Sequence, residues 1–190
     1  MYNWSMKTIP LTRGYTALVD DGDYEFLSKF SWQAHIDKHK SGDVVYARSS
    51  VNALGAFCAL LPHELRPKVG QRQTTVIMHQ LILGKRARID HADGNGLNNQ
   101  RTNLRPANRA QNGWNRSKCP GLTSRFKGVH WNKARAKWTV AISCNKIRKY
   151  IGDFRDECDA AQAYNFAALE LFGEFAKFNA SLGQGCVTGP

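Results

Sequence analysis

The first third of the chain alternates apolar and polar residues over short stretches, which is the pattern of half-buried β-strands. The stretches are KTIPL, YTALV and VVYARSSV. The first two flank the turn TRG and therefore predict a β-hairpin. Residues 20–32 instead space their apolar side chains as a short helix would, with Leu27, Phe30 and Trp32 as candidate core residues.

The segment that follows is less regular. Residues 49–75 join an apolar run to a polar one, and we interpret them as an insertion in the first domain. TTVIMHQLILG then has an apolar pattern that fits either a strand or a helix, ending at Gly84. Residues 88–112, RIDHADGNGLNNQRTNLRPANRAQN, predict a strand, a turn-rich loop, a returning strand and the start of a helix.

The pattern is clearer in the second half. KGVHWN, KWTVAIS and IRKYIG predict three short strands, and DECDAAQAYNFAALELFG then changes to helical period. Asp156 is placed to cap this helix and Gly173 to end it. Along the middle strand, Trp138, Val140 and Ile142 share one face, which we expect to lie toward the helix. Residues 124–179 thus predict a three-stranded antiparallel sheet with one helix, so the predicted fold class is α+β.

Composition and charge narrow the function. The 190 residues are 42% hydrophobic, enough for a packed core, and the formal net charge is +12. A basic protein favours a polyanionic partner, with nucleic acid ahead of an acidic membrane surface. No apolar run approaches the ~20 residues of a membrane span, and MYNWSMK does not resemble a signal peptide. We therefore expect a cytoplasmic protein of a bacterial or phage-infected cell that does not bind membranes.

The basic residues are unevenly distributed. Between positions 116 and 149 there are ten Lys or Arg and no Asp or Glu. Residues 113–123 are rich in Gly, Pro, Ser and Asn, which is typical of a linker. The predicted organisation is a first domain over 1–112, a basic linker over 113–123, a second domain over 124–179 and a flexible tail over 180–190. The five cysteines form no CxxC pair, so no structural zinc is expected.

The polar residues of 88–112 admit two interpretations, a surface loop or a small metal site. Asp90 and Asn112 supply a carboxylate and an amide oxygen, which suit one Mg²⁺, or Mn²⁺, that keeps several waters. His91 would accept a proton from a water molecule that attacks a phosphodiester. Asn103 would hold the loop and orient the imidazole. His79 is either a core histidine or a site-supporting, phosphate-binding residue. Nearby arginines would contact phosphate or be solvated, namely Arg105 and Arg109.

This segment resembles the HNH motif of phage and intron-encoded homing endonucleases. His91 is followed by Asn103 twelve residues later and by Asn112 twenty-one residues later, as in that family. The resemblance implies a ββα-metal fold in which Asp90 and Asn112 bind the metal and His91 is the general base. The pair His79–Gln80 departs from the His-Arg that is commoner in the family, and the long 49–75 segment is a second departure.

Residues 124–179 resemble the AP2 DNA-binding domain. KGVHW, KWTVAI, IGDF, AAQAYNFAALELFG and the closing Asn179 carry the resemblance. It implies that the sheet lies in the major groove of double-stranded DNA while the helix packs behind it. The implied DNA contacts are His130, Asn132, Arg135, Arg148 and Tyr150; His130 stands where the family usually has Arg.

Together the two resemblances predict a site-directed DNA endonuclease with an HNH catalytic half and an AP2 targeting half. A monomeric homing enzyme of a phage or mobile intron is the leading interpretation. A DNA-binding regulator with an inert nuclease half is an alternative from another class. A restriction or packaging nuclease with the same chemistry is a further one.

Overall fold

The computed structural model describes residues 6–119 and 121–179, which fall into two compact units. The first comprises the described residues up to His39 together with Asp43–Asn108, and the second comprises Lys40–Gly42 and the residues from Arg109 onward. The division lies four residues before the predicted boundary at 112, so the predicted linker 113–123 belongs to the second unit. The predicted tail, 180–190, lies outside the described residues.

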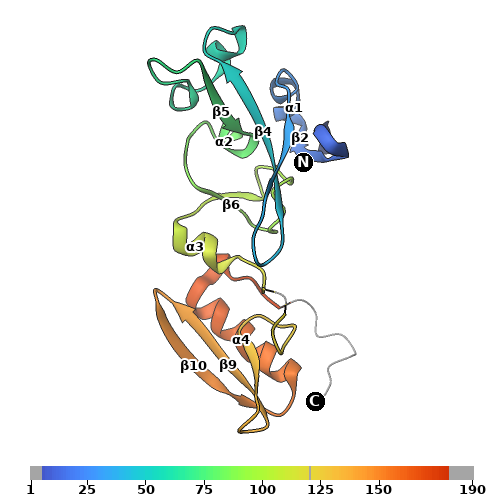
Figure 1. Cartoon of the computed structure of the whole chain (residues 1–190), viewed down its shortest axis with the longest axis vertical. Helices are drawn as coiled ribbons and strands as arrows, with labels where there is room; N and C mark the ends of the chain where they lie inside the picture. Colours follow the sequence, from blue (N-terminus) through green and yellow to red (C-terminus); the bar gives the residue numbers. More distant parts are fainter. Residues whose placement is uncertain (1–5, 120, 180–190) are drawn as a thin grey trace, which may run out of the picture. The chain divides into compact units, whose positions relative to one another are not determined.

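The first unit contains the predicted hairpin, which is confirmed, and a second antiparallel sheet. β1 (Met6–Pro10) pairs with β2 (Thr16–Asp20) across the turn Thr12–Gly14, and helix α1 (Asp21–Leu27) follows directly. The second sheet has the order β3-β4-β5. Its strands are β3 (Gln33–Asp37), β4 (Val44–Asn52) and β5 (Gln73–Ile77), and Figure 1 shows β4 beside β5. The ambiguous stretch before Gly84 is both strand and helix, because α2 (Met78–Ile82) follows β5 at once.

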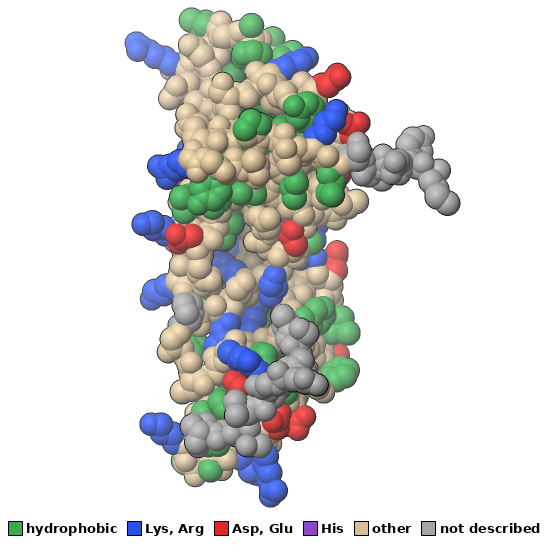
Figure 2. Space-filling model, turned by 90° about the vertical axis from the view of Figure 1, so that its right-hand side faces the viewer, with side chains coloured by type: hydrophobic (Ala, Val, Ile, Leu, Met, Phe, Trp, Pro, Cys, Tyr) green, Lys and Arg blue, Asp and Glu red, His purple; other side chains and the backbone are tan. Residues whose placement is uncertain are grey.

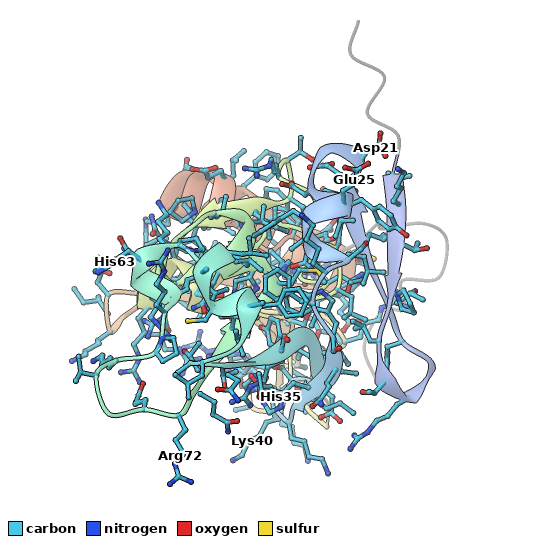
Figure 3. The ribbon with its side chains drawn as sticks, turned by 90° about the horizontal axis from the view of Figure 1, so that it is seen from above. Asp21, Glu25, His35, Lys40, His63 and Arg72 are labelled. Atoms are coloured by element: carbon cyan, nitrogen blue, oxygen red, sulfur yellow. The ribbon has the colours of Figure 1, made fainter. Side chains whose placement is uncertain are left out.

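Residues 49–75 fold as part of the first unit, and their interpretation as an insertion stays a prediction. Both ends of the segment are strand residues of β4 and β5, and two 3-10 turns lie between them, Ala56–Leu60 and His63–Leu65. Leu61 and Leu65 are fully buried in the core of the first unit. Figure 3 shows polar His63 pointing outward instead. Short 3-10 turns bury isolated residues without a helical or strand period, so the pattern gave no signal for them.

The predicted strand, loop, strand and helix over residues 88–112 are all present. β6 (Ile89–His91) pairs antiparallel with β7 (Leu104–Pro106), with Asp90 opposite Arg105 and His91 opposite Leu104. The helix is α3 (Arg109–Trp114), and it belongs to the second unit. Its Trp114 ring stacks on Phe172 with centroids 4.6 Å apart and planes 13° apart, which anchors the helix in the second core.

The second unit contains the predicted three-stranded sheet and helix. Strands β8 (Val129–Asn132), β9 (Lys137–Cys144) and β10 (Ile147–Phe154) are antiparallel in the order β10-β9-β8, and α4 (Glu157–Phe172) covers one face (Figure 1). Asp156 caps α4 by accepting hydrogen bonds from the N–H groups of residues 158 and 159, and Gly173 ends it with a φ of 53° before a last turn, Gly173–Phe175. Both terminal predictions are confirmed.

The core of the second unit forms where β9 meets α4. Trp138, Val140 and Ile142 are buried toward the helix, as predicted from their alternation. Gly128 has a φ of +77°, and a Cβ there would lie 2.0 Å from the ring of Tyr164, so only glycine fits between β8 and α4. The predicted α+β class is thus confirmed. None of the described helices is long and apolar enough to cross a membrane.

Candidate active site and candidate DNA-binding face

The loop between β6 and β7 is held against the first hairpin by hydrogen bonds to the backbone and to one carboxylate of β2. The Leu18 N–H donates to the Leu97 carbonyl at 2.8 Å, and the Asn99 N–H donates back to the Leu18 carbonyl at 2.8 Å. The buried Asp20 carboxylate accepts a bond from the Arg101 N–H at 2.8 Å. Strand β2 therefore fixes the loop at a point distant in sequence.

Asn103 closes the same loop from within. Its side-chain oxygen accepts from the Asp93 N–H at 3.0 Å, and its amide nitrogen donates to Asp93 Oδ1 at 3.0 Å and to the Asn98 carbonyl at 2.8 Å. Partial burial acts to raise the pKa of Asp93, but hydrogen bonds from Asn95, Asn98 and Asn103 lower it overall. The predicted loop-holding contacts of Asn103 are therefore present, and Asp93 is their ionised centre.

His91 stands at the end of β6 and is 5% exposed. Its Nε2 lies 3.4 Å from Oδ1 of Asn99, a side chain that is 1% exposed. The Asn99 amide nitrogen donates to the Leu97 carbonyl at 3.2 Å, which turns its oxygen toward the imidazole. The imidazole thus meets Asn99, whereas the described side-chain bonds of Asn103 go to the loop. Burial lowers the pKa of His91, against the opposing effects of Asn99, Asp93 and Asp90.

Two further rings surround His91, and only one of them was a candidate from the sequence. The centroids of the His79 and His91 rings lie 5.0 Å apart, with an angle of 75° between the ring planes. The centroid of the Tyr46 ring lies 5.8 Å from each of them. His79 is 6% exposed, and among the described residues its buried Nδ1 has no hydrogen-bond partner. Burial and then the neighbouring His91 lower the pKa of His79 to about 3. Tyr46 was missed, because nothing in a strand pattern marks it as a neighbour of either histidine.

Gly96 explains how Tyr46 comes so close to the loop. A Cβ at position 96 would lie 2.5 Å from the Val45 carbonyl oxygen and 2.8 Å from the Tyr46 ring. Contacts that short are excluded, so the loop can press against β4 only where it has no side chain. The glycine-rich composition that first suggested an ordinary turn therefore also serves packing against the site.

Asp90 is buried beside its cross-strand neighbour. It is 4% exposed, and its Oδ2 accepts from Nε of Arg105 at 2.9 Å and from Nη2 at 2.7 Å. Arg105, predicted to contact phosphate, therefore forms an ion pair with Asp90. Opposite charges facing each other across a two-stranded pair are a stabilising arrangement. Any cation at Asp90 would share the carboxylate with this guanidinium.

The predicted site residues divide between the two units. Asp90, His91 and Asn103 lie on the β6–β7 hairpin or its loop in the first unit, while Arg109 and Asn112 lie on α3 in the second. Among the described residues, no cluster of three or more His, Cys, Asp or Glu could hold a metal ion. One carboxylate with amide and water oxygens remains a donor set that fits Mg²⁺ or Mn²⁺.

The predicted DNA contacts of the second unit share the sheet face opposite α4. His130 pairs with Thr139, Arg148 with Ser143 and Tyr150 with Ala141, and these β9 residues alternate with Trp138, Val140 and Ile142, which face α4. The same register puts Asn132 beside Lys137 at the end of the sheet, and Asn132 Oδ1 accepts from the Arg135 N–H at 3.2 Å. We call this shared face the open sheet face.

Not all of the basic residues point outward. The Lys118 amine donates to the Ser124 and Phe126 carbonyls, and the Lys127 amine donates to the Trp114 and Arg116 carbonyls. Burial, followed by the charge of a nearby lysine, lowers the pKa of Lys127 to about 8. These two amines hold the segment before β8 in place. Other Lys and Arg side chains project from the surface, as Figure 2 shows for one face.

The fold and these contacts define an α+β protein that carries a buried Asp–His pair on a two-stranded hairpin. No protein-family model matches the chain. Over 91 residues it is 41% identical to a protein of Acanthamoeba polyphaga mimivirus named "Uncharacterized HNH endonuclease L560", a match that covers 48% of this chain and 46% of that protein. The chain thus spans about half the length of this viral relative.

A second similarity covers more of the relative. Over 90 residues the chain is 34% identical to Protein 3.8 of Escherichia phage T7, and the match covers 47% of this chain and 74% of that protein. The chain belongs to the same family as this T7 protein.

Proposed function

We propose that the chain is a site-directed DNA endonuclease that hydrolyses phosphodiester bonds with one divalent cation and a histidine base. The observation that carries the proposal is the buried Asp90–His91 pair, with its imidazole oriented by Asn99. The similarity to a mimivirus protein named as an HNH endonuclease supports the same activity. Homing, by a phage or a mobile intron, is the biological role that we propose for it.

His91 would act as the base through Nδ1. Because Asn99 presents an oxygen to Nε2, the hydrogen of the neutral imidazole is held on Nε2, and the lone pair is left on Nδ1. The lowered pKa of His91 keeps the ring neutral near pH 7. Nδ1 would then take the proton of a water that attacks phosphorus, an effect worth roughly 10²–10⁴-fold in rate.

Asp90 and Asn112 would hold the cation through a carboxylate and an amide oxygen. When bound, Mg²⁺ or Mn²⁺ would stabilise the charge on the phosphate and on the leaving oxygen. Arg105 would keep the Asp90 side chain in one orientation through its two hydrogen bonds. Asn103 would act through the loop, and the rings of Tyr46 and His79 would limit rotation of the His91 ring.

The open sheet face would bind double-stranded DNA, as an AP2-like module would. Its exposed Arg148 and Tyr150, with His130, Asn132 and Arg135, present charged and planar groups that can contact phosphates and base edges. We propose that the protein acts as a monomer. The second unit would then supply affinity and register to a first unit that cuts with little selectivity by itself.

The activity is tested with supercoiled plasmid DNA in Mg²⁺, in Mn²⁺ and in EDTA. We expect nicking or cutting by the wild type in either metal, none in EDTA, and a loss of about 100-fold or more in His91→Ala. His63→Ala changes an exposed histidine of the same unit and is the matched control. Cutting by His91→Ala, or in EDTA, at the wild-type rate would show that the assignment is wrong.

One observation favours a second candidate, a DNA-binding regulator with an inert nuclease half. The ion pair with Arg105 engages the carboxylate on which metal binding depends. If the wild type binds DNA but cuts none in either metal, this candidate replaces the first. Arg148→Ala tests DNA binding by the second unit apart from cleavage by the first. It should weaken site-specific binding and leave residual nicking.

A further inference from the structure

One carboxylate lies on the open sheet face among basic and aromatic side chains. Asp153 is the first acidic residue after Asp93 in the sequence, so it interrupts the longest stretch without negative charge. Its side chain is largely shielded, with 13% exposed. An acidic group on a surface proposed to meet DNA opposes binding by repelling phosphates, so its position calls for a physical reason.

A β-bulge puts Asp153 on this face. Residues 150 and 153 are three apart, and in a regular strand side chains at that spacing point to opposite faces. The register of β10 shifts between Tyr150 and Gly152, so that Tyr150 lies opposite Ala141 and Asp153 lies opposite Thr139. Because Thr139 and Ala141 share a face of β9, the extra residue brings Tyr150 and Asp153 together.

Three side chains converge on this carboxylate. Arg135 Nη1 donates to Oδ2 at 2.7 Å, and the Thr139 hydroxyl donates to Oδ1 at 2.6 Å. Tyr150, on the same face, also stabilises the ionised carboxylate. The bonds from Thr139 and Arg135, and then the influence of Tyr150, lower the pKa of Asp153 to about 2. The carboxylate is therefore ionised at every pH at which the protein would act.

We infer that Asp153 is a positioning residue for DNA sequence recognition, which holds the Arg135 guanidinium and the Tyr150 ring in fixed orientations on the open sheet face. Arg135 is 59% exposed in its side chain although one end is bonded, so the rest of its donor fork faces outward. A guanidinium fixed at one end loses less conformational entropy when it binds a base edge in two-point fashion. This inference rests on the proposed DNA binding by the second unit.

The inference predicts opposite effects on two kinds of binding. Asp153→Asn removes a negative charge near phosphates, so affinity for non-specific DNA should stay the same or rise. The same change releases Arg135 and Tyr150, so affinity for a preferred sequence should fall by about tenfold. A purely electrostatic role for Asp153 would raise both affinities together, and a purely structural role would lower both.

The experiment measures both affinities on the full chain. The wild type first selects a duplex from a randomised DNA pool in EDTA, and binding of this duplex and of poly(dI–dC) is then measured for each variant. Thr139→Val removes one of the hydrogen bonds to the carboxylate without changing charge. Like Asp153→Asn, it should lower the ratio of the affinity for the selected duplex to the affinity for poly(dI–dC). Glu170→Gln, on the exposed side of α4, removes one negative charge elsewhere in the unit and should leave the ratio unchanged.

A double-mutant cycle shows whether Asp153 acts through Arg135. In an Arg135→Ala background, Asp153→Asn should change the ratio much less than in the wild type, because the group to be positioned is gone. An unchanged ratio in Asp153→Asn, or equal effects in both backgrounds, would overturn the inference while DNA binding stands. A wild type that selects no sequence would also overturn it, and one that binds no DNA would overturn the proposed function with it.

Discussion

Acid should destabilise the first unit through one buried histidine. His79 lies between Tyr46 and His91 with a pKa of about 3, whereas an unfolded histidine has a pKa near ~6.5. Below ~6.5 the unfolded chain binds a proton at this position that the folded chain does not bind. The stability that neutral His79 permits is therefore complete above pH ~6.5 and is lost as the pH falls toward 3.

The magnitude follows from the two pKa values. Each pH unit between them is worth about 1.4 kcal/mol, and lowering the pH from 7 to 5 crosses about one and a half such units. His79 should thus remove about 2 kcal/mol from the free energy of unfolding of the first unit. That is a large part of the roughly 5–15 kcal/mol typical of a domain.

The assay must report on the first unit alone. In protein labelled with fluorotryptophan, the ¹⁹F resonance of Trp32 serves this purpose, because its indole is buried there and donates to the Leu27 carbonyl at 2.8 Å. Urea titrations at pH 7 and pH 5 then give the free energy of unfolding at each pH. His79→Gln should reduce its pH dependence by about 2 kcal/mol, whatever its effect at pH 7.

His63→Gln makes the same substitution at an exposed position and should behave as the wild type. If the His79→Gln variant loses as much stability between pH 7 and pH 5 as the wild type does, the imidazole is not held neutral by burial. The account of the ring cluster would then be wrong.

Three other outcomes test separate parts of the structure. Asn103→Ala removes three side-chain hydrogen bonds and should lower the free energy of unfolding of the first unit by about 2 kcal/mol in the same urea assay. The control Asn95→Ala removes one such bond and should lower it by less than about 1 kcal/mol. Equal losses in the two variants would contradict the loop-closing role of Asn103. Gly128→Ala places a methyl group against the Tyr164 ring at a residue with positive φ, so it should destabilise the second unit by about 3 kcal/mol. Thermal unfolding of this variant at the wild-type temperature would refute the close packing of residue 128 against Tyr164. Because the pKa of His91 is lowered, the midpoint of the acid-side fall in DNA cleavage rate should lie below pH ~6.5, and a midpoint at or above that pH would argue against His91 as the base.

The elements with a regular period were predictable from the sequence. The first hairpin, the three strands of the second sheet and helix α4 all follow from spacing and end signals, such as Asp156 and Gly173 at the two ends of α4. Strand β3 and the 3-10 turns around Leu61 and Leu65 were not found, because they are short and lack a clear period.

At the candidate site, the sequence identified the hairpin but not its contacts. The Asp–His pair and the loop-holding role of Asn103 follow from residue types and local turn chemistry. Asn99, by contrast, has no feature in the sequence that distinguishes it from an ordinary turn residue, yet it is buried against His91. Its direction depends on β2, which holds the loop from about eighty residues away in sequence.

The sequence by itself therefore determined the strands and helices that have a regular period, and the buried face of β9, because both are encoded by local spacing. Only the tertiary structure decided which polar groups meet. Arg105 faces Asp90 across a hairpin, Lys118 turns inward to backbone carbonyls, and a bulge brings Asp153 beside Tyr150. Such pairings depend on strand register and on long-range packing, which a local pattern of apolar and polar residues does not specify.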